Sequence, residues 1–205
     1  MSRELELSGF PTLKPAIITK VHIGDVHDLG TIHNGSRLTH YVSAEPPKSS
    51  TRQPPSNLGQ EEYFADLFFQ GTPTGSIESV PGFEPAFKAN VNFGADWLSF
   101  DPDGKHARID LRGVARTEQG HAIDFRYVGV IKMPPEVWKI FNMDSDMATV
   151  PFGYATGSHT FLVADPALKD LENSVFVSNG RIIVHEKGLT VETRQSLVVA
   201  STAMD

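Results

Sequence analysis

The chain has 205 residues, a formal net charge of −7 at pH 7 and no cysteine. This length fits one domain, and a hydrophobic content of 40% with 21% charged residues is ordinary for a soluble globular protein. The acidic balance argues against a nucleic-acid-binding surface, which needs clustered Lys and Arg. The absence of cysteine excludes disulfides, thiolate catalysis and Cys-ligated zinc or iron–sulfur sites.

No segment has the pattern of an export signal or a membrane helix. Met1–Ser8 carries Arg3, Glu4 and Glu6 in place of an apolar stretch. No run approaches the roughly 18 apolar residues that a membrane helix needs. We therefore expect a soluble, cytoplasmic protein with no membrane partner and no nucleic-acid partner.

Short apolar stretches separated by Gly and Pro run through the chain, which is typical of all-β proteins. The first are Ala16–Ile23 and Arg37–Ser43, with turn residues at Asp28–Gly35 between them. The Pro- and Ser-rich segment Glu45–Gly59 predicts a mobile loop. The next segment, Glu61–Gln70, is ambiguous because its aromatic residues fit either a helix or a strand.

The middle of the chain carries the clearest strand signals. Ser76–Val80 and Ala86–Phe93 flank a Pro-Gly turn. Within Ala89–Met133, the turns Asp101–Gly104 and Glu118–Gly120 separate alternating stretches, and the Gly of each turn supplies positive φ. We predict a three-stranded antiparallel meander over this region.

The last third of the chain mixes helical and strand signals. A pair of prolines opens a predicted short helix at Pro134–Phe141, and a loop is predicted at Met143–Ser158, so that residues 134–158 form an inserted helix and loop. Pro166–Glu172 predicts a turn or short helix. Further strands are predicted at Ser174–Val177, Arg181–His185 and Leu189–Val199. Eight to ten strands predict one barrel or sandwich domain over residues 1–205.

The stretch His106–Arg116 separates its residues into two faces by alternation. Its odd-numbered residues are small or apolar, whereas its even-numbered residues include Arg108, Asp110 and Arg112. Two interpretations stay open. The charged face lies in solvent, as in a half-buried strand, or it lines the lumen of a barrel that holds one small ligand. In the second case Asp124 of the next strand joins the ion pairs.

Acid–base chemistry is the reaction type for which the sequence offers candidates. Asp96 precedes Trp97, and a carboxylate beside an indole can be desolvated, which raises its pKa. Alternatively, Asp96 caps a turn. His40 alternates with Leu38 and Val42 and points inward if this stretch is a strand, either as a proton shuttle or as a core residue.

Two further residues complete this set of candidates. Arg112 is suited to holding an enolate or carboxylate oxygen, or to pairing with a neighbouring Asp. Tyr127 either stabilises developing negative charge or packs beside Phe125. The candidate catalytic residues are Asp96, His40 and Arg112. The candidate substrate-binding residues are Trp97, Arg108, Asp110, Asp124 and Tyr127.

The sequence offers little support for a metal or a cofactor. The early histidines and aspartates, whose spacing fits no helical or hairpin ligand pair, are His22, Asp25, His27, Asp28 and His33. Neither a G-x-S-x-G elbow nor a phosphate-binding loop occurs. We expect no metal and no cofactor.

Several short motifs occur in a fixed order. They are Gly94-Ala95-Asp96-Trp97, Asp103-Gly104, Asp110-Leu111-Arg112, Gln119-Gly120, Tyr127-Val128-Gly129-Val130 and Phe176-Val177-Ser178-Asn179-Gly180-Arg181. In this order they resemble the DUF3237 family, also called UPF0311, which often has Asp-Gly where this chain has Gln119-Gly120. The resemblance implies a lipocalin-like, mostly antiparallel β-barrel. The family has no general assigned activity, but its fungal members look associated with natural-product pathways.

We therefore expect an all-β protein, a single antiparallel lipocalin- or calycin-like barrel with one or two short helices and a ligand-sized cavity. The leading hypothesis is a cofactor-independent isomerase, cyclase or lyase that acts on a hydrophobic, oxygenated small molecule in secondary-metabolite biosynthesis. One alternative is a non-catalytic carrier of such a molecule. Another is a structural or dimerisation module with a filled barrel, in which an exposed edge such as Leu189–Val199 pairs across a homodimer.

Overall fold

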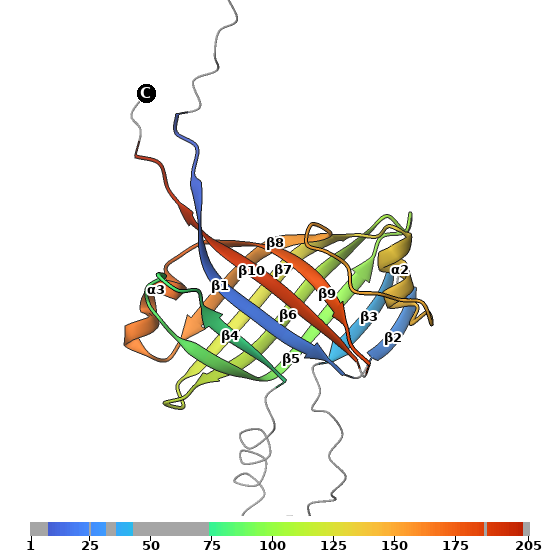
Figure 1. Cartoon of the computed structure of the whole chain (residues 1–205), viewed down its shortest axis with the longest axis horizontal. Coiled ribbons are helices and arrows are strands. Elements are labelled where there is room, and N and C mark those ends of the chain that lie inside the picture. Colours follow the sequence, from blue (N-terminus) through green and yellow to red (C-terminus); the bar gives the residue numbers. More distant parts are fainter. Residues whose placement is uncertain (1–7, 25, 32–35, 43–73, 187, 203–205) are drawn as a thin grey trace, which may run out of the picture.

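The structure is a computed structural model that describes residues 8–24, 26–31, 36–42, 74–186 and 188–202. Its strands form one antiparallel sheet that closes into a barrel (Figure 1). The strands are β1 (Thr12–Ile23), β2 (Val26–Thr31), β3 (Arg37–Val42), β4 (Gly75–Ser79), β5 (Lys88–Phe100), β6 (His106–Thr117), β7 (Ala122–Lys132), β8 (Ala155–Val163), β9 (Phe176–Val184) and β10 (Leu189–Val199). The helices are α2 (Pro135–Phe141), the 3₁₀ turn η1 (Pro166–Leu168) and α3 (Lys169–Glu172).

Eight of the strands close the ring, in the order β5-β4-β1-β10-β9-β8-β7-β6, and β6 pairs back onto β5. The other edge of β5 is shared by two strands, because β4 pairs with its first half and β3 with its second half. The β2–β3 hairpin is thereby attached to the ring through β5. The expected all-β antiparallel barrel with short helices is confirmed.

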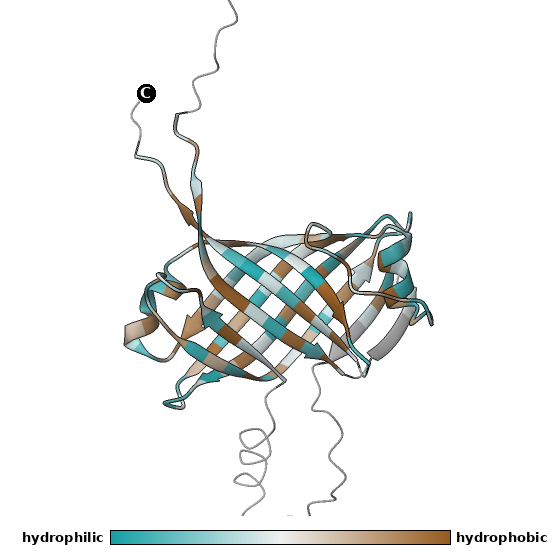
Figure 2. Cartoon of the chain, in the orientation of Figure 1, coloured by the Kyte–Doolittle hydropathy of each residue, from teal (hydrophilic) through white to brown (hydrophobic). Residues whose placement is uncertain are grey.

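The two faces of each strand separate by polarity, and Figure 2 shows hydrophilic and hydrophobic bands alternating along the strands. On β6, Ala107, Ile109 and Leu111 are buried, whereas Arg108 and Arg112 are exposed. The charged face of this strand therefore lies in solvent, and the interpretation that it lines the lumen is wrong. The physical reason is that ionised groups keep their hydration on the outside while the apolar set fills the interior.

The meander, the helix after Pro134 and the helical turn at Pro166–Glu172 form as predicted. Several other elements differ. β9 is continuous where two shorter strands were predicted, and β5 continues beyond the predicted stretch Ala86–Phe93 to Phe100, with a bulge between Val91 and Phe93. β8 begins inside the loop predicted at Met143–Ser158, and β2 ends inside the turn predicted at Asp28–Gly35. The loop predicted at Glu45–Gly59 and the segment Glu61–Gln70 lie outside the described residues.

The two ends of the barrel carry α2 and α3 respectively (Figure 1). At the α3 end the interior is packed with aromatic rings, and Phe176 meets Phe83 and Phe161 edge-on at centroid distances of 6.3 and 5.5 Å. At the α2 end, Trp138 stacks on Phe100 at 5.3 Å and donates a hydrogen bond from Nε1 to the carbonyl of Gly104 at 3.0 Å. These contacts anchor α2 against the barrel.

The fold bears on two predictions about partners, namely an exposed strand edge and the absence of a membrane helix. The segment Leu189–Val199 is not an exposed edge, because β10 pairs with β1 on one side and β9 on the other. In the part of the chain that the structure describes, we find no helix of the length and apolarity that crossing a membrane requires.

Candidate functional site

A cavity opens in the half of the barrel that α2 covers. It comprises about 750 Å³ of empty space, its mouth included, and its walls are mostly aliphatic. The wall residues come from the barrel strands and α2, and include Leu98, Ile109, Ile131, Val137, Ile182 and Val191. The polar groups on this wall include Asp96 and Tyr127. An apolar space with a few polar groups is the usual form of a small-molecule site.

Asp96 reaches the cavity from an interrupted part of the β5–β6 ladder. The paired residues run from Asp96–Leu111 directly to Ser99–Arg108, and in this gap the backbone N–H of Asp110 donates to Asp96 Oδ1 at 3.1 Å. Asp96 is half-buried because part of its surface faces the cavity.

The environment of Asp96 changes its protonation. Burial raises the pKa of this carboxyl to about 7; the hydrogen bond from the Asp110 N–H opposes the rise, and the negative charge of Asp110 adds to it. A carboxyl group with this pKa is present in both forms near neutral pH. It is therefore able to accept or donate a proton at the cavity wall.

Tyr127 is buried inside the barrel, where its ring lies parallel to a neighbouring imidazole. Its ring stacks on that of His159 at a centroid distance of 4.3 Å and an angle of 6°. It also covers Gly157, where a Cβ atom would stand 2.6 Å from Cε2 of Tyr127. Burial raises the pKa of Tyr127 to about 12; a side-chain hydrogen bond with Ser178 opposes this rise, and the charge of Asp96 adds to it. The phenol therefore keeps its proton at neutral pH.

Polar side chains form a layer in the middle of the barrel, between the cavity and the packed aromatic end. This polar layer consists of Tyr127, His159, Ser178, Thr193, Gln195 and Thr19, all of them buried. Nε2 of His159 lies 2.9 Å from Oγ of Ser178, and Nε2 of Gln195 donates to Oγ1 of Thr19 at 2.7 Å. Burial lowers the pKa of His159 to about 3, so its imidazole is neutral.

Three atoms of the polar layer are buried without a hydrogen-bond partner among the described residues. They are His159 Nδ1, Thr193 Oγ1 and Gln195 Oε1. An unsatisfied buried polar group costs about 1–3 kcal/mol. Three such costs together are comparable with the roughly 5–15 kcal/mol by which a whole domain is stable. Groups of this kind are satisfied by water or a ligand in native proteins, and Tyr127 of this layer also lines the cavity.

The predicted site residues fall into two groups. Asp96 and Tyr127 face the interior and lie close enough for the charge of Asp96 to raise the pKa of Tyr127. The backbone of His40 lies on β3 opposite Trp97, but the side chain of His40 is outside the described part of the structure. Trp97 itself is 39% exposed.

The interpretation that the charged candidates line the lumen is corrected here, because these side chains lie on the outer surface of the barrel. Asp110 pairs there with Arg126 at 2.9 Å and Arg112 at 3.5 Å. Asp124 and Arg108 are exposed on the same side of the wall. Their carboxylates and guanidinium groups are solvated, so they do not contact a molecule in the cavity.

His159 and Ser178 were missed at the sequence level. The signal that would have found His159 is the alternation of Ala155, Gly157, His159 and Phe161, which places the imidazole on the inner face of a strand. A segment with Gly157 next to Ser158 does not look like a strand by composition. Recognising it as one would have put a buried histidine beside Tyr127.

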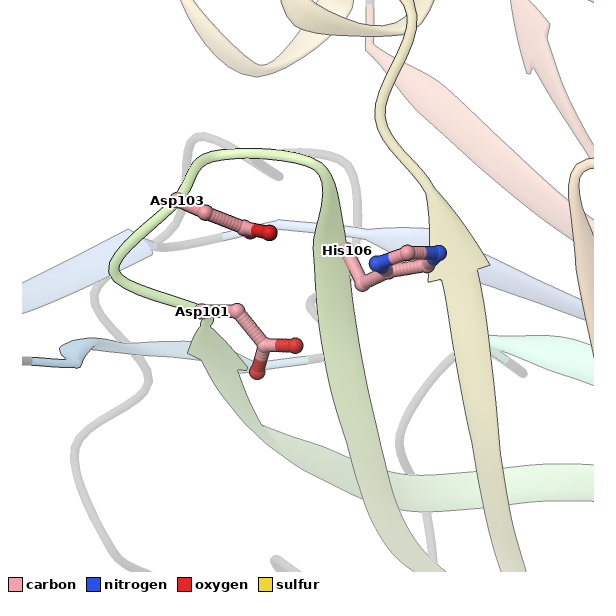
Figure 3. A group of neighbouring side chains, drawn as sticks. All are labelled: Asp101, Asp103 and His106. Atoms are coloured by element: carbon pink, nitrogen blue, oxygen red, sulfur yellow. The ribbon is translucent and has the colours of Figure 1, made fainter.

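A group of possible metal ligands lies at the turn between β5 and β6. The ligand atoms of Asp101, Asp103 and His106 lie within 4.8 Å of one another (Figure 3). The Asp101 carboxylate already pairs with Arg108 at 2.6 Å, and Oδ1 of Asp103 accepts the Lys105 N–H at 2.9 Å. These contacts explain why the two carboxylates lie close together, since both stabilise the tight turn between β5 and β6.

Among the described side chains, the early histidines and aspartates do not form a cluster of possible metal ligands. Nδ1 of His22 lies 2.7 Å from Oγ1 of Thr190, which is also 2.9 Å from Nε2 of His185. Asp25, His33 and the side chains of His27 and Asp28 lie outside the described residues.

Comparison with known proteins places the chain in a family. The model of the family described as "Protein of unknown function (DUF3237)" matches residues 48–198. The chain belongs to the DUF3237 family. The resemblance seen in its motifs is thereby confirmed. No curated protein matches the chain.

Solved structures with the same fold come from several bacteria. A conserved protein of unknown function from Rhodopseudomonas palustris has 16% identity and a TM-score of 0.61, with 94% of this chain and 100% of that chain covered. A protein of unknown function from Clostridium acetobutylicum has 15% identity and a TM-score of 0.58 over 92% and 99% of the two chains. A β-barrel-like protein from Acinetobacter baumannii has 16% identity and a TM-score of 0.57 over 95% and 99%. At these levels of sequence identity, the similarity supports a shared fold.

Proposed function

We propose that this DUF3237 protein is a cofactor-independent isomerase, cyclase or lyase that acts on a hydrophobic, oxygenated small molecule in secondary-metabolite biosynthesis. The observation that supports this best is a carboxyl group, Asp96, that has a pKa of about 7 and faces an aliphatic cavity. Proton transfer is most efficient when the pKa of the catalytic group lies near the working pH. Aliphatic walls supply the binding of an apolar body and exclude water.

The proposed reaction needs a single group that accepts and returns a proton, and this group is the carboxyl of Asp96. As carboxylate, Asp96 takes a proton from one atom of the bound molecule; as carboxylic acid, it returns that proton to another atom of the same molecule. The net reaction is an isomerisation or a ring closure. It is an elimination when the proton goes to a leaving group. Tyr127 keeps its proton at neutral pH, also lines the cavity and is a hydroxyl donor for a developing negative charge on oxygen.

The test removes the proton carrier and keeps its shape. Molecules that co-purify with the protein from its natural host are identified by native mass spectrometry and offered to the wild type and to Asp96→Asn. We expect the variant to bind them and to lose turnover at least about 100-fold, the usual contribution of a general acid or base. The matched control is Asp170→Asn, an exposed carboxylate on α3. Full turnover by Asp96→Asn rejects the assignment of Asp96.

A second candidate function is a carrier that binds its ligand without converting it. The unpartnered atoms of the polar layer favour this candidate, because they need a hydrogen-bonding ligand but no reaction. Recovery of the bound molecule chemically unchanged after incubation at several pH values supports the carrier. The remaining hypothesis, a structural module with a filled barrel, is disfavoured by the cavity.

A further inference from the structure

We propose that the polar layer is the subsite for a neutral oxygen-bearing head group, a hydroxyl or a carbonyl, of a ligand whose apolar body lies in the cavity. The inference rests on the proposed function only in placing the ligand in the cavity. It does not require that Asp96 transfers a proton. In the free protein, water offers the same hydrogen-bonding chemistry.

The order of residues along three adjacent strands locates this subsite. Going from the cavity toward the packed end, the inward-facing residues are Leu189, Val191, Thr193, Gln195 and Leu197 on β10, Ile182, Gly180, Ser178 and Phe176 on β9, and Ala155, Gly157, His159 and Phe161 on β8. Each strand passes from small or aliphatic residues to polar ones and then to a large apolar residue. The register places Thr193 opposite Gly180 and Gln195 opposite Ser178, and the first polar residues, Thr193 and Ser178, directly follow the cavity-lining residues Val191 and Gly180 on the inner face.

The unused hydrogen-bonding atoms of the polar layer match a neutral oxygen. Oε1 of Gln195 accepts, whereas the hydroxyl of Thr193 donates or accepts. The side chains that carry these atoms are nine-tenths or more buried, with exposed fractions of 2% for Gln195 and 3% for Thr193. A hydroxyl both donates and accepts and is able to satisfy such a mixed set, and a carbonyl satisfies its donors.

The charges around the cavity disfavour an anionic head group. Among the residues that line it, Asp96 is acidic and Arg181 is basic, and the side chain of Arg181 lies on the outer side of the wall. The Arg181 guanidinium is committed to Glu192, with Nη2 at 2.7 Å from Oε2. An anion would therefore be buried beside a carboxylate with no cation of its own, which is costly. A fatty-acid-like ligand is not expected.

Three probes with one ring system distinguish the head groups. Binding of 2-naphthol, 2-methylnaphthalene and 2-naphthoate to the wild type is measured by isothermal titration calorimetry at pH 7. We expect 2-naphthol to bind about tenfold more tightly than 2-methylnaphthalene, the gain of one or two hydrogen bonds, and 2-naphthoate to bind most weakly. Equal affinities of the first two, tightest binding of 2-naphthoate, or failure of all three to bind overturns the proposal.

Variants assign the preference to the polar layer. Thr193→Val keeps the shape of the side chain and removes an unpartnered hydroxyl, so we expect it to weaken 2-naphthol binding about three- to tenfold while leaving 2-methylnaphthalene unaffected. Its melting temperature should not fall, because no hydrogen bond to the described residues is lost. The matched control is Thr160→Val, exposed on β8. Unchanged 2-naphthol affinity in Thr193→Val overturns the assignment.

The same measurement separates this proposal from the proposed function. Asp96→Asn should retain the preference for 2-naphthol over 2-methylnaphthalene, because the head group is bound by the polar layer. If Asp96→Asn keeps full turnover while the preference persists, the acid–base role of Asp96 fails and the subsite stands. If turnover is lost but 2-naphthol has no advantage, the subsite fails and the proposed function stands.

Discussion

Among single residues, Asp96 links the stability of the barrel to pH. Its folded-state pKa of about 7 lies above the ordinary value of 3.8 because the neutral carboxyl is favoured on burial. The folded state therefore holds this proton more tightly than the unfolded state. The stability that comes from the neutral form is complete below pH 4 and is lost as the pH rises through 7.

This linkage predicts the behaviour of Asp96→Asn, which stays neutral at every pH. We expect its free energy of unfolding, relative to the wild type, to rise between pH 4 and pH 8. A shift of about 3 pKa units sets an upper bound of about 4 kcal/mol on this rise. Urea unfolding of both proteins across this range measures it. A difference that stays constant with pH contradicts the raised pKa of Asp96.

A second residue-scale prediction concerns Glu192, whose carboxylate is buried on the outer side of the wall. Burial alone would raise its pKa, but hydrogen bonds from Arg181 and Arg194 lower it. Removing one partner leaves a buried charge poorly compensated, so we expect Arg181→Met to cost about 3 kcal/mol of stability. Arg112→Met, in an exposed pair, should cost no more than about 1 kcal/mol. Chemical denaturation at pH 7 compares the two; equal losses contradict the clamp at Glu192.

Among the elements, β6 and β7 were predictable from the sequence and β8 was not. β6 alternates strictly between small or apolar and mostly charged residues, and Gly104 and Gly120, at φ of 68° and 87°, close the turns that bound it. β8 instead places Gly157 and His159 at inward positions, where local preference does not favour a strand. Its hydrogen bonds to β7 and β9 on both sides hold it in the sheet. Such pairing between distant segments is not visible in local sequence.

The close approach of β7 and β8 gives an element-scale prediction for Gly157→Ala. A Cβ atom there would stand 2.2 Å from the carbonyl oxygen of Val128 and 2.6 Å from Cε2 of Tyr127, so backbone and ring must both move. We expect a loss of about 1–3 kcal/mol or more, as for other overpacked interiors. The neighbouring exposed position supplies the control, Ser158→Ala, with little change expected. Thermal unfolding measures both, and an unaltered melting temperature in Gly157→Ala contradicts this packing.

For the whole molecule, alternation shows which residues share a face but not which face is inside. The ion pairs of Asp110 with Arg112 and Arg126 would satisfy these groups on either side of a barrel wall, so the sequence alone left both placements open. Closure of the ring decides the matter, because the small and aliphatic side chains must fill its interior. The raised pKa of Asp96 was predicted from its neighbour Trp97, although the indole is exposed and the carboxyl itself faces the cavity, whereas the part of Asp96 in a site stays a proposal.

Closure also predicts where the molecule opens first. The eight ring strands have neighbours on both sides, whereas the first residues of β1 pair with β10 alone and project from the barrel with it (Figure 1). Among the described residues this projecting ribbon has a third neighbour as far as Val198, whose N–H donates to the carbonyl of Val175, and the outer edge of β1 is unpaired there, so its amides should exchange with solvent through local opening. Hydrogen exchange followed by mass spectrometry should show Thr12–Lys14 exchanging at least tenfold faster than Ile17–Val21, which β4 and β10 flank. Equal protection along β1 would mean that the ribbon is held by something outside the ring, and a dimer seen by light scattering would then identify a second copy as its support.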